Sequence, residues 1–309
     1  MYHNIKSNVA VFFFLPVALF MEICRVVFSR LRLSLFHQRN GVIEILAEHK
    51  QTQPPRPRVL VVISHITSVY ETQDATKAFP KLDKLTRAIE GIYTSFAHCD
   101  FQILINTVSH RHVTAYLPEY QRDFIQVQEQ LSCEPMFVGF KAQDEFIKRI
   151  NKFDWFLCIE DDIVINDSYL LNKLEEFNKA SGKNNALLIP NRYEMWKGNK
   201  TYIDLINVKW NQWSVINISN VYFAECQNPH GGLYCLSKPQ LQFWMESGRL
   251  WNNKITFVGS LESAVTGCLF ECFSLYKPHP SNLHFLEVQH WDTKYSKIYA
   301  DGLIQPWGK

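Results

Sequence analysis

The pattern of the chain alternates short apolar runs with segments of helical periodicity. Five runs are typical of buried parallel strands: residues 59–63, 101–105, 136–138, 155–159 and 186–189. Helical patterning lies between these runs, around residues 81–96, 146–153 and 169–180. This alternation indicates an α/β fold in which a mostly parallel central sheet is flanked by helices. In such sheets the ligand site lies beyond the carboxyl ends of the strands.

The second half of the chain has a less regular pattern. Residues 193–213 are rich in Trp, Tyr and Asn and are expected to form substrate-facing loops. Gly231 and Gly232 interrupt a strand-like stretch that continues to Leu236, which indicates a bulge or a close approach of two backbones. Residues 260–273 place apolar side chains on one face, so we expect a helix there with Ser260 as its N-cap.

An apolar segment near the amino terminus, residues 9–28, predicts a membrane anchor. It is long enough for one transmembrane helix, although Glu22 and Arg25 interrupt it. The alternative is a buried N-terminal helix. The prolines that follow predict a stiff linker. The predicted organisation is therefore an anchor and juxtamembrane segment at 1–50, a linker at 51–58 and a catalytic domain at 59–309.

The charges around the apolar segment predict its orientation. Lys6 precedes the segment, whereas Arg25 lies within it and Arg30 and Arg32 follow it. Cytoplasmic flanks of membrane helices carry an excess of Lys and Arg. We therefore expect a membrane-associated protein whose catalytic domain faces the cytoplasm, with the Golgi lumen as the alternative.

Composition and charge narrow the class of partner. The 309 residues carry 32 Lys and Arg against 30 Asp and Glu, a formal net charge of +2, which argues against a nucleic-acid binder. The sequence has no P-loop, no Gly-x-Gly-x-x-Gly and no Gly-x-Ser-x-Gly, which weakens ATPase, dinucleotide-enzyme and serine-hydrolase interpretations.

The cysteines do not indicate a metal site. Cys268 and Cys272 are expected to pack in the core, and Cys226 and Cys235 would form a disulfide only in a lumenal domain.

The strongest chemical signal is an acidic motif, Glu160-Asp161-Asp162, between two apolar runs. Carboxylates in an apolar setting need compensation, and at the end of a strand they can hold a divalent cation that in turn holds a diphosphate. Strand alternation places Glu160 and Asp162 on one face and Asp161 on the other. The alternative is an acidic strand-to-turn junction, since Asn166 and Asp167 nearby also favour turns.

This stretch resembles a motif of a known enzyme family. Residues 155–162, Trp-Phe-Leu-Cys-Ile-Glu-Asp-Asp, resemble the DxD motif of GT-A glycosyltransferases in a Glu-Asp-Asp form, similar to N-acetylglucosaminyltransferases of the α-mannoside type. The resemblance implies a GT-A-like fold and a hexosyl- or N-acetylhexosaminyl-transferase. Such an enzyme moves a sugar from a nucleotide-diphosphate sugar to a hydroxyl of a glycan, lipid or protein acceptor. It also implies Mn²⁺ or Mg²⁺ on the diphosphate, with Asp162 as the metal ligand and Glu160 and Asp161 on the ribose or donor sugar.

The resemblance gives Glu262 a candidate catalytic role. Glu262 lies in the first turn of the predicted helix 260–273, where GT-A enzymes that invert configuration often place a catalytic base. Such a base takes the proton of the acceptor hydroxyl as it attacks the anomeric carbon. The alternative is a carboxylate that stabilises the helix dipole. An acidic pair is usual at this point, and this chain has Glu262-Ser263, so the stereochemistry stays open.

A late histidine is the second candidate metal ligand. In this family a histidine near the carboxyl end often completes the metal coordination, and His290 occupies that place. A neutral imidazole suits Mn²⁺. The alternatives are a structural role for His290, or ligation by His284, which would share its face on a strand.

Residues that follow two of the predicted strands are candidates for donor binding. Four residues after the first strand are placed to contact a nucleoside base and ribose: Ser64, His65, Thr67 and Tyr70. Arg192 follows the fifth predicted strand, and it either neutralises the charge of the diphosphate or pairs with Glu194.

Two other functions use the same features. A non-catalytic protein of this fold would bind a nucleotide or a sugar without turnover. A metal-dependent nucleotidyltransferase would also place carboxylates around a diphosphate.

Overall fold

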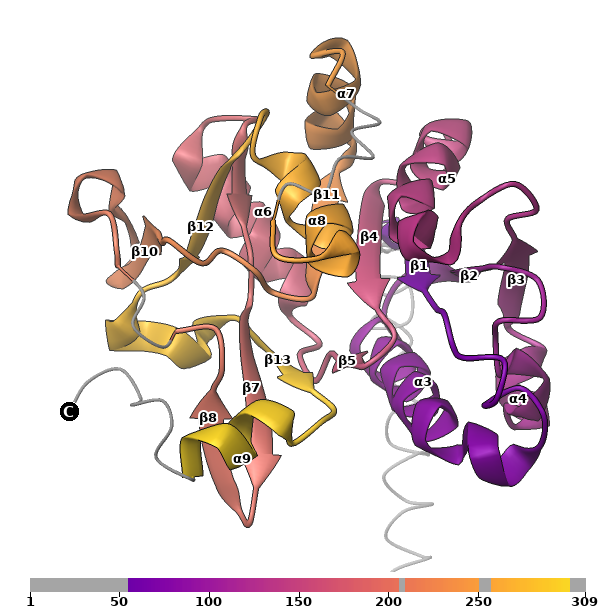
Figure 1. Cartoon of the computed structure of the whole chain (residues 1–309). Helices are drawn as coiled ribbons and strands as arrows, with labels where there is room; N and C mark the ends of the chain where they lie inside the picture. The colour runs from indigo at the N-terminus through magenta and orange to yellow at the C-terminus, as the bar shows by residue number, and fades with distance from the viewer. Residues whose placement is uncertain (1–54, 206–208, 250–256, 301–309) are drawn as a thin grey trace, which may run out of the picture. The chain divides into compact units, whose positions relative to one another are not determined.

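The computed structural model describes residues 55–205, 209–249 and 257–300 (Figure 1). The chain divides into two units, residues 1–55 and 56–309, and the fold described below belongs to the second. The predicted anchor at 1–50 and most of the predicted linker lie outside the described residues.

The centre of the fold is a five-stranded sheet in the order β11-β4-β1-β2-β3. Four strands run parallel: β1 (Arg58–Ser64), β2 (Asp100–Thr107), β3 (Ile125–Glu129) and β4 (Trp155–Glu160). The fifth, β11 (Leu233–Ser237), pairs antiparallel with β4. The predicted mostly parallel sheet is therefore confirmed, with an antiparallel strand at one edge.

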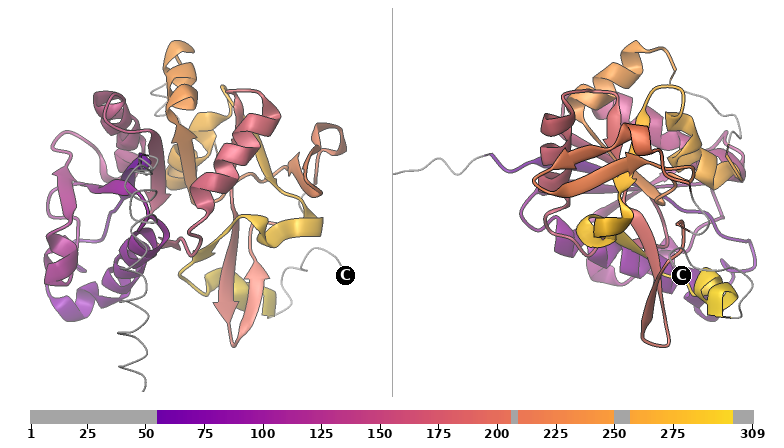
Figure 2. Two further views of the ribbon diagram at one scale, coloured as in Figure 1. Left: turned by 180° about the vertical axis from the view of Figure 1, so that it is seen from behind. Right: turned by 90° about the vertical axis from the view of Figure 1, so that its left-hand side faces the viewer.

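Helices cover both faces of this sheet because alternate residues of its strands are apolar on both sides (Figures 1 and 2). Val61 of β1 packs in the core that includes α3 (Ala75–Ser95) and α6 (Leu170–Ser181). Val62 packs in the opposite core. That core includes residues of three helices: α5 (Ala142–Arg149), α7 (Lys238–Glu246) and α8 (Ser260–Val265).

The second half of the chain forms two smaller sheets. The strands of one are β6 (Ala186–Leu188), β12 (Ser274–Pro278), β10 (Val221–Glu225) and β9 (Ile216–Ile218). The strands of the other are β5 (Ile163–Val164), β13 (Glu287–His290), β7 (Asn191–Trp196) and β8 (Asn199–Tyr202). The remaining helices are short. Three lie between strands of the central sheet: η1 (Thr114–Tyr116), α4 (Glu119–Arg122) and η2 (Pro135–Lys141). The others lie in the second half of the chain: η3 (Gln212–Ser214), η4 (Gly267–Leu269), η5 (Pro280–Phe285) and α9 (Lys294–Ala300), which follows β13.

Two predicted strands have a different place in the structure. The strand predicted at 136–138 is wrong, because these residues lie in the 3₁₀ helix η2. Pro135 starts η2, since its fixed φ suits a helical turn and its missing N–H cannot join a sheet. The strand predicted at 186–189 exists as β6, but it pairs with β12 rather than joining the central sheet.

Two predictions for the second half also need correction. Residues 193–213 are not all loop, because their first part forms the β7–β8 hairpin with Tyr193 opposite Tyr202. The helix predicted at 260–273 ends at Val265, and its N-cap is Gly259 rather than Ser260. Thr266 leaves the helical conformation, with φ −139° and ψ −55°.

The prediction of a membrane-associated protein with a transmembrane helix is wrong for the part of the chain that the structure describes. None of the helices in residues 55–205, 209–249 and 257–300 has the length and apolar character needed to cross a bilayer. The segment on which the prediction rested, residues 9–28, lies outside the described residues. The predicted membrane localisation, in either orientation, is therefore wrong for the described residues.

The disulfide considered for a lumenal domain is not formed, because Cys226 and Cys235 are both free thiols.

Candidate active site

Strand pairing brings the acidic motif next to the late histidine. Glu160 ends β4, and the chain turns at Asp161 and Asp162 before it enters β5. Strand β5 pairs antiparallel with β13, with Ile163 opposite His290. The backbone N–H of Trp291 donates to the carbonyl oxygen of Asp162 at 2.7 Å. Residues far apart in sequence therefore meet at the carboxyl edge of the central sheet, as the fold class predicts.

Asp162, His290 and Glu194 form a line of three side chains. Nε2 of His290 lies 3.3 Å from Oδ2 of Asp162, and Nδ1 lies 2.8 Å from Oε1 of Glu194. The carboxylate of Glu194 is buried and also accepts a backbone N–H of Ser296 at 2.6 Å. Burial lowers the pKa of His290, but the contacts with the two carboxylates outweigh it and raise the pKa to about 9. Glu194 thus fixes the ring so that Nε2 faces Asp162.

Asp161 faces the other way, as strand alternation predicts. Its Oδ2 lies 2.6 Å from Nδ1 of His65, and its Oδ1 accepts from Lys81 Nζ at 2.8 Å. Nε2 of His65 accepts the backbone N–H of Val113 at 3.2 Å, so Nδ1 carries the ring proton and donates to Asp161. Both oxygens of Asp161 therefore have partners, and its carboxylate links His65, which follows β1, to Lys81 of α3.

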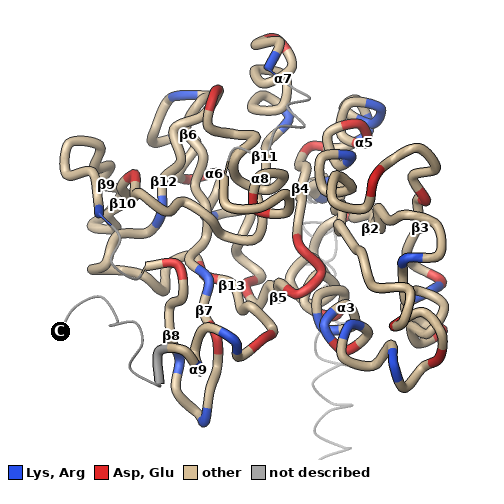
Figure 3. The backbone as a smooth tube through the Cα atoms, viewed as in Figure 1, with Lys and Arg blue, Asp and Glu red and all other residues tan. Residues whose placement is uncertain are grey.

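Two lysines of α3 reach the acidic motif, and the sequence patterns did not single them out. Figure 3 shows the backbone of α3, with several Lys and Arg positions, near the acidic turn between β4 and β5. Lys81 binds Asp161. Lys84 Nζ lies 3.6 Å from Oδ2 of Asp162 and 2.6 Å from Oδ2 of Asp292. The available signal was their spacing, since residues three apart in a helix share one face.

Arg192 lies in a buried charge network. It donates from Nε and Nη2 to the two oxygens of Asp204, at 2.9 and 2.7 Å. Its Nη1 lies 3.7 Å from Oε2 of Glu160. Lys277, which is completely buried, lies 3.6 Å from Asp204. The predicted alternative of a pair with Glu194 is wrong, because that carboxylate holds His290.

Glu160 lies between this network and the acidic turn. Nε2 of His230 lies 3.8 Å from Oε1 of Glu160, and burial holds the pKa of His230 well below its usual value, so its ring is neutral. Burial raises the pKa of Glu160, and the Arg192 charge lowers it. The negative charges of Asp162 and Glu262 raise it further, so that the pKa is about 8. Glu160 and Glu262 therefore lie close enough to interact electrostatically.

Gly231 and Gly232 confirm the predicted close approach of two backbones. A Cβ on Gly232 would lie 2.5 Å from Cδ1 of Ile163, and its φ is +68°. A Cβ on Gly231 would lie 2.8 Å from the carbonyl oxygen of Pro190. The backbone N–H of Glu160 donates to the carbonyl oxygen of Gly232 at 2.9 Å, so these glycines let β11 approach the acidic motif.

The remaining predicted site residues are spread around this centre. Glu262 is half-buried in the first turn of α8. Ser64 and Thr67 are buried near the end of β1, whereas Tyr70 is exposed, with Lys77 Nζ 4.6 Å from the centre of its ring. His284 lies in η5 and not on a strand with His290, so the predicted common strand face is wrong.

Asn106 is a further polar residue that the sequence patterns missed. It ends the apolar part of β2 directly opposite Ser64 of β1. Both side chains are buried, and within the described part of the chain the Asn106 amide and the Ser64 hydroxyl have no hydrogen-bond partner. A polar side chain in an apolar run at the carboxyl end of a strand was the available signal.

The donor atoms at Asp162 and His290 suit a divalent cation. Among the described residues, no group of three or more His, Cys, Asp and Glu side chains could hold a metal ion by itself. Asp162 supplies a carboxylate oxygen, and His290 supplies an imidazole nitrogen whose other nitrogen is held by a buried carboxylate. Such a set fits Mn²⁺ or Mg²⁺ when phosphate oxygens and water complete the coordination.

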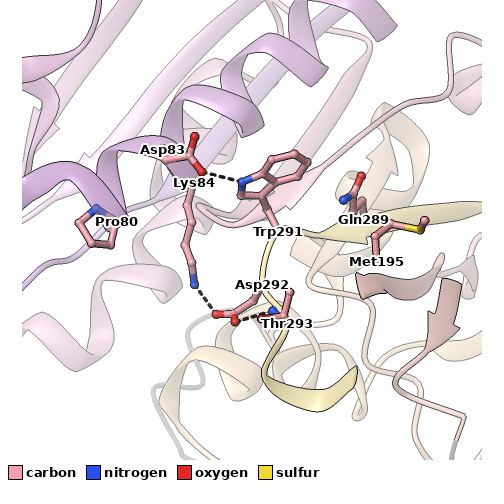
Figure 4. A pocket seen from close by; sticks show the side chains of 8 residues that line it. All are labelled: Pro80, Asp83, Lys84, Met195, Gln289, Trp291, Asp292 and Thr293. Atoms are coloured by element: carbon pink, nitrogen blue, oxygen red, sulfur yellow. Dashed lines mark hydrogen bonds and ion pairs between the residues drawn. The ribbon is translucent and has the colours of Figure 1, made fainter. Parts of the chain in front are cut away.

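A small pocket is lined by Lys84 and by residues on either side of His290 in the chain (Figure 4). Its volume is about 370 Å³. Its lining residues are Pro80, Asp83, Lys84, Met195, Gln289, Trp291, Asp292 and Thr293. Trp291 Nε1 donates to Asp83 at 2.7 Å, which joins α3 to the end of β13.

Comparisons with known proteins give a fold-level similarity only. No family model matches the chain, and no curated protein matches its sequence. The chain is similar to the solved structure of mannose-1-phosphate geranyltransferase from Thermus thermophilus, at 8% identity, 76% coverage of this chain and 73% of that chain. The TM-score is 0.37. An overlap this low carries no argument about function.

Proposed function

We propose that this protein is a metal-dependent glycosyltransferase that moves a sugar from a nucleotide-diphosphate sugar to an acceptor hydroxyl. The observation that carries the proposal is the Asp162–His290–Glu194 line at the carboxyl edge of the sheet, with 3.3 Å between Asp162 Oδ2 and His290 Nε2. A second carboxylate, Glu262, interacts electrostatically with Glu160 of the same motif. A pair that can hold a cation, together with a separate carboxylate that can act as a base, suits transfer from a diphosphate donor to a hydroxyl.

The proposed reaction gives each of these site residues a role. Asp162 and His290 would hold Mn²⁺ or Mg²⁺, which when bound neutralises charge on the departing diphosphate. Glu194 accepts a hydrogen bond from Nδ1 of His290, which would leave Nε2 to bind the cation once the ring has lost its second proton. Glu262 accepts the proton of the acceptor hydroxyl as the new glycosidic bond forms. Arg192 lies 3.7 Å from Glu160 and would add positive charge next to the acidic motif, where the diphosphate of the donor would lie.

A donor screen tests the proposal. The full chain is titrated by calorimetry with nucleotide sugars and nucleoside triphosphates in the presence of Mn²⁺, and sugar transfer is followed by mass spectrometry with a broad acceptor panel. We expect tight binding of one nucleotide sugar and a glycosylated product. Binding of a triphosphate but of no nucleotide sugar would instead indicate a nucleotidyltransferase. Donor binding without transfer or donor hydrolysis would indicate a non-catalytic binding protein.

His290→Ala should lower activity in a way that excess metal reverses. One lost ligand reduces the occupancy of the cation, whereas Asp162 still supplies the negative charge that attracts it. We expect the Mn²⁺ concentration for half-maximal activity to rise about tenfold, with partial recovery at saturating Mn²⁺. The measurement is a metal titration of the initial rate at a fixed donor concentration. An unchanged Mn²⁺ dependence would remove His290 from the metal site.

Glu262→Gln should lower kcat and leave binding unchanged. A general base acts only in the transition state, and its loss typically costs about 10²- to 10⁴-fold in rate. The amide keeps the size of the side chain, so α8 should remain intact. Donor and Mn²⁺ affinities are measured by calorimetry alongside kcat. An unchanged kcat would leave Glu262 with the role of stabilising the helix dipole.

A further inference from the structure

Lys84 shares the atom that the proposed function assigns to the metal. Oδ2 of Asp162 faces Nε2 of His290 at 3.3 Å and Nζ of Lys84 at 3.6 Å. The same Nζ binds Asp292 Oδ2 at 2.6 Å, on the pocket side of the acidic turn (Figure 4). The Lys84 side chain is 24% exposed and that of Asp162 19%, so bulk water does not fully screen these charges.

An ammonium in this position acts differently on a cation and on an anion. It repels a divalent cation that approaches the Asp162 oxygen, and the repulsion is appreciable where the effective dielectric constant is well below that of water. A diphosphate that arrives with the cation reverses the sign, because its oxygens attract the same ammonium. Lysine suits such a task, since its four-carbon stem lets the charge move.

The surroundings of Lys84 permit this movement. The other oxygen of Asp292, Oδ1, accepts backbone N–H groups of Thr293 at 2.6 Å and Lys294 at 3.1 Å. Asp292 therefore stays anchored at the start of α9 when Lys84 leaves it. Lys81 does not have this freedom, because its partner Asp161 is buried and also holds His65.

We propose that Lys84 couples cation binding to diphosphate binding: it opposes a lone cation at Asp162 and His290, and it binds a phosphate oxygen when cation and diphosphate enter together. This inference rests on the proposed function, since it assumes a cation at these two residues. It makes the cation–diphosphate pair the preferred ligand and disfavours the free ion. The expected thermodynamic signature is strong positive coupling between the two ligands.

The test is a Mn²⁺ titration followed by the electron paramagnetic resonance signal of free Mn²⁺, alone and with UDP, GDP, ADP or CDP. In Lys84→Gln we expect Mn²⁺ alone to bind about tenfold more tightly than in wild type. We expect the nucleoside diphosphate to bind about tenfold more weakly at saturating Mn²⁺. Lys84→Arg, which keeps the charge, should retain most of the coupling. Lys179→Gln removes a positive charge from an exposed pair on α6 and should change neither affinity.

The outcomes separate this inference from the proposed function. Mn²⁺ binding that Asp162→Asn leaves unchanged, or no Mn²⁺ binding with any of the four diphosphates, would contradict the proposed function itself. Mn²⁺ that binds through Asp162 with equal affinity in wild type and Lys84→Gln would contradict only the role of Lys84. Thermal melts of all variants check that each is folded.

Discussion

Asp162→Asn is expected to lower the rate of sugar transfer about a thousandfold, because a cation that stabilises the leaving diphosphate contributes several kcal/mol to the transition state. The amide has the same shape as the carboxylate, and the backbone bond from Trp291 N to Asp162 O does not involve the side chain. The fold should therefore survive. The measurements are kcat with the donor found by the screen, and Mn²⁺ affinity by calorimetry.

Asp161→Asn is the matched control, one residue away on the opposite face. It weakens the contacts with His65 and Lys81, so its main effect should be on stability, with a loss of about 1–3 kcal/mol. Its Mn²⁺ affinity should stay near that of wild type. Equal loss of Mn²⁺ affinity in both variants would contradict the choice of Asp162 over Asp161 as the carboxylate that holds the cation.

The central sheet could be predicted because its strands are apolar on both faces. In β1, alternate residues such as Val61 and Val62 enter different cores, which gives an unbroken apolar run with no competing helical period. The edge strand β3 could not be found this way. Its sequence is Ile-Gln-Val-Gln-Glu, and only Ile125, which is partly buried, packs against the core. The strand therefore lacks the unbroken apolar run that reveals β1.

The candidate site could be predicted in part, because part of it directly follows an apolar strand. Glu160, Asp161 and Asp162 were visible because three carboxylates directly follow an apolar strand. Their division into two faces followed from strand geometry, and the structure has Asp161 on the side of His65. The partners were not visible, because they depend on tertiary contacts. The sequence suggests Glu194 only as a partner of Arg192, two residues away, whereas the pairing of β13 with β7 brings His290, 96 residues along the chain, next to it.

The ends of helices and strands followed local chemistry that the periodic pattern did not contain. The apolar face of residues 260–273 is real, since Val265, Cys268 and Leu269 are buried together. The helix nevertheless stops after Val265, because Thr266 places its hydroxyl 2.8 Å from Nδ1 of the buried His230. That tertiary hydrogen bond and the buried network behind it override helical propensity.

That network predicts the largest effect on stability, from Asp204→Asn. Asp204 faces two buried cations, Arg192 and Lys277, and burial of one charge without its partner is costly. Removal of the carboxylate charge should lower the free energy of unfolding by about 3–5 kcal/mol. Urea unfolding followed by circular dichroism measures the change. Glu175→Gln, which breaks an exposed pair with Lys179, is the control and should unfold with wild type.

The same residue should make stability depend on pH in a defined direction. The pKa of Asp204 is lowered in the folded protein, because the nearby Arg192 and Lys277 charges outweigh the effect of burial. A carboxyl whose pKa is lower in the folded than in the unfolded chain stabilises the fold above its unfolded pKa, about 3.9, and this contribution falls as the pH drops toward the folded pKa. Wild type should therefore lose stability more steeply than Asp204→Asn between about pH 5 and pH 2. Parallel slopes for the two proteins over this range would mean that Asp204 titrates normally and that the buried cations are compensated by other groups.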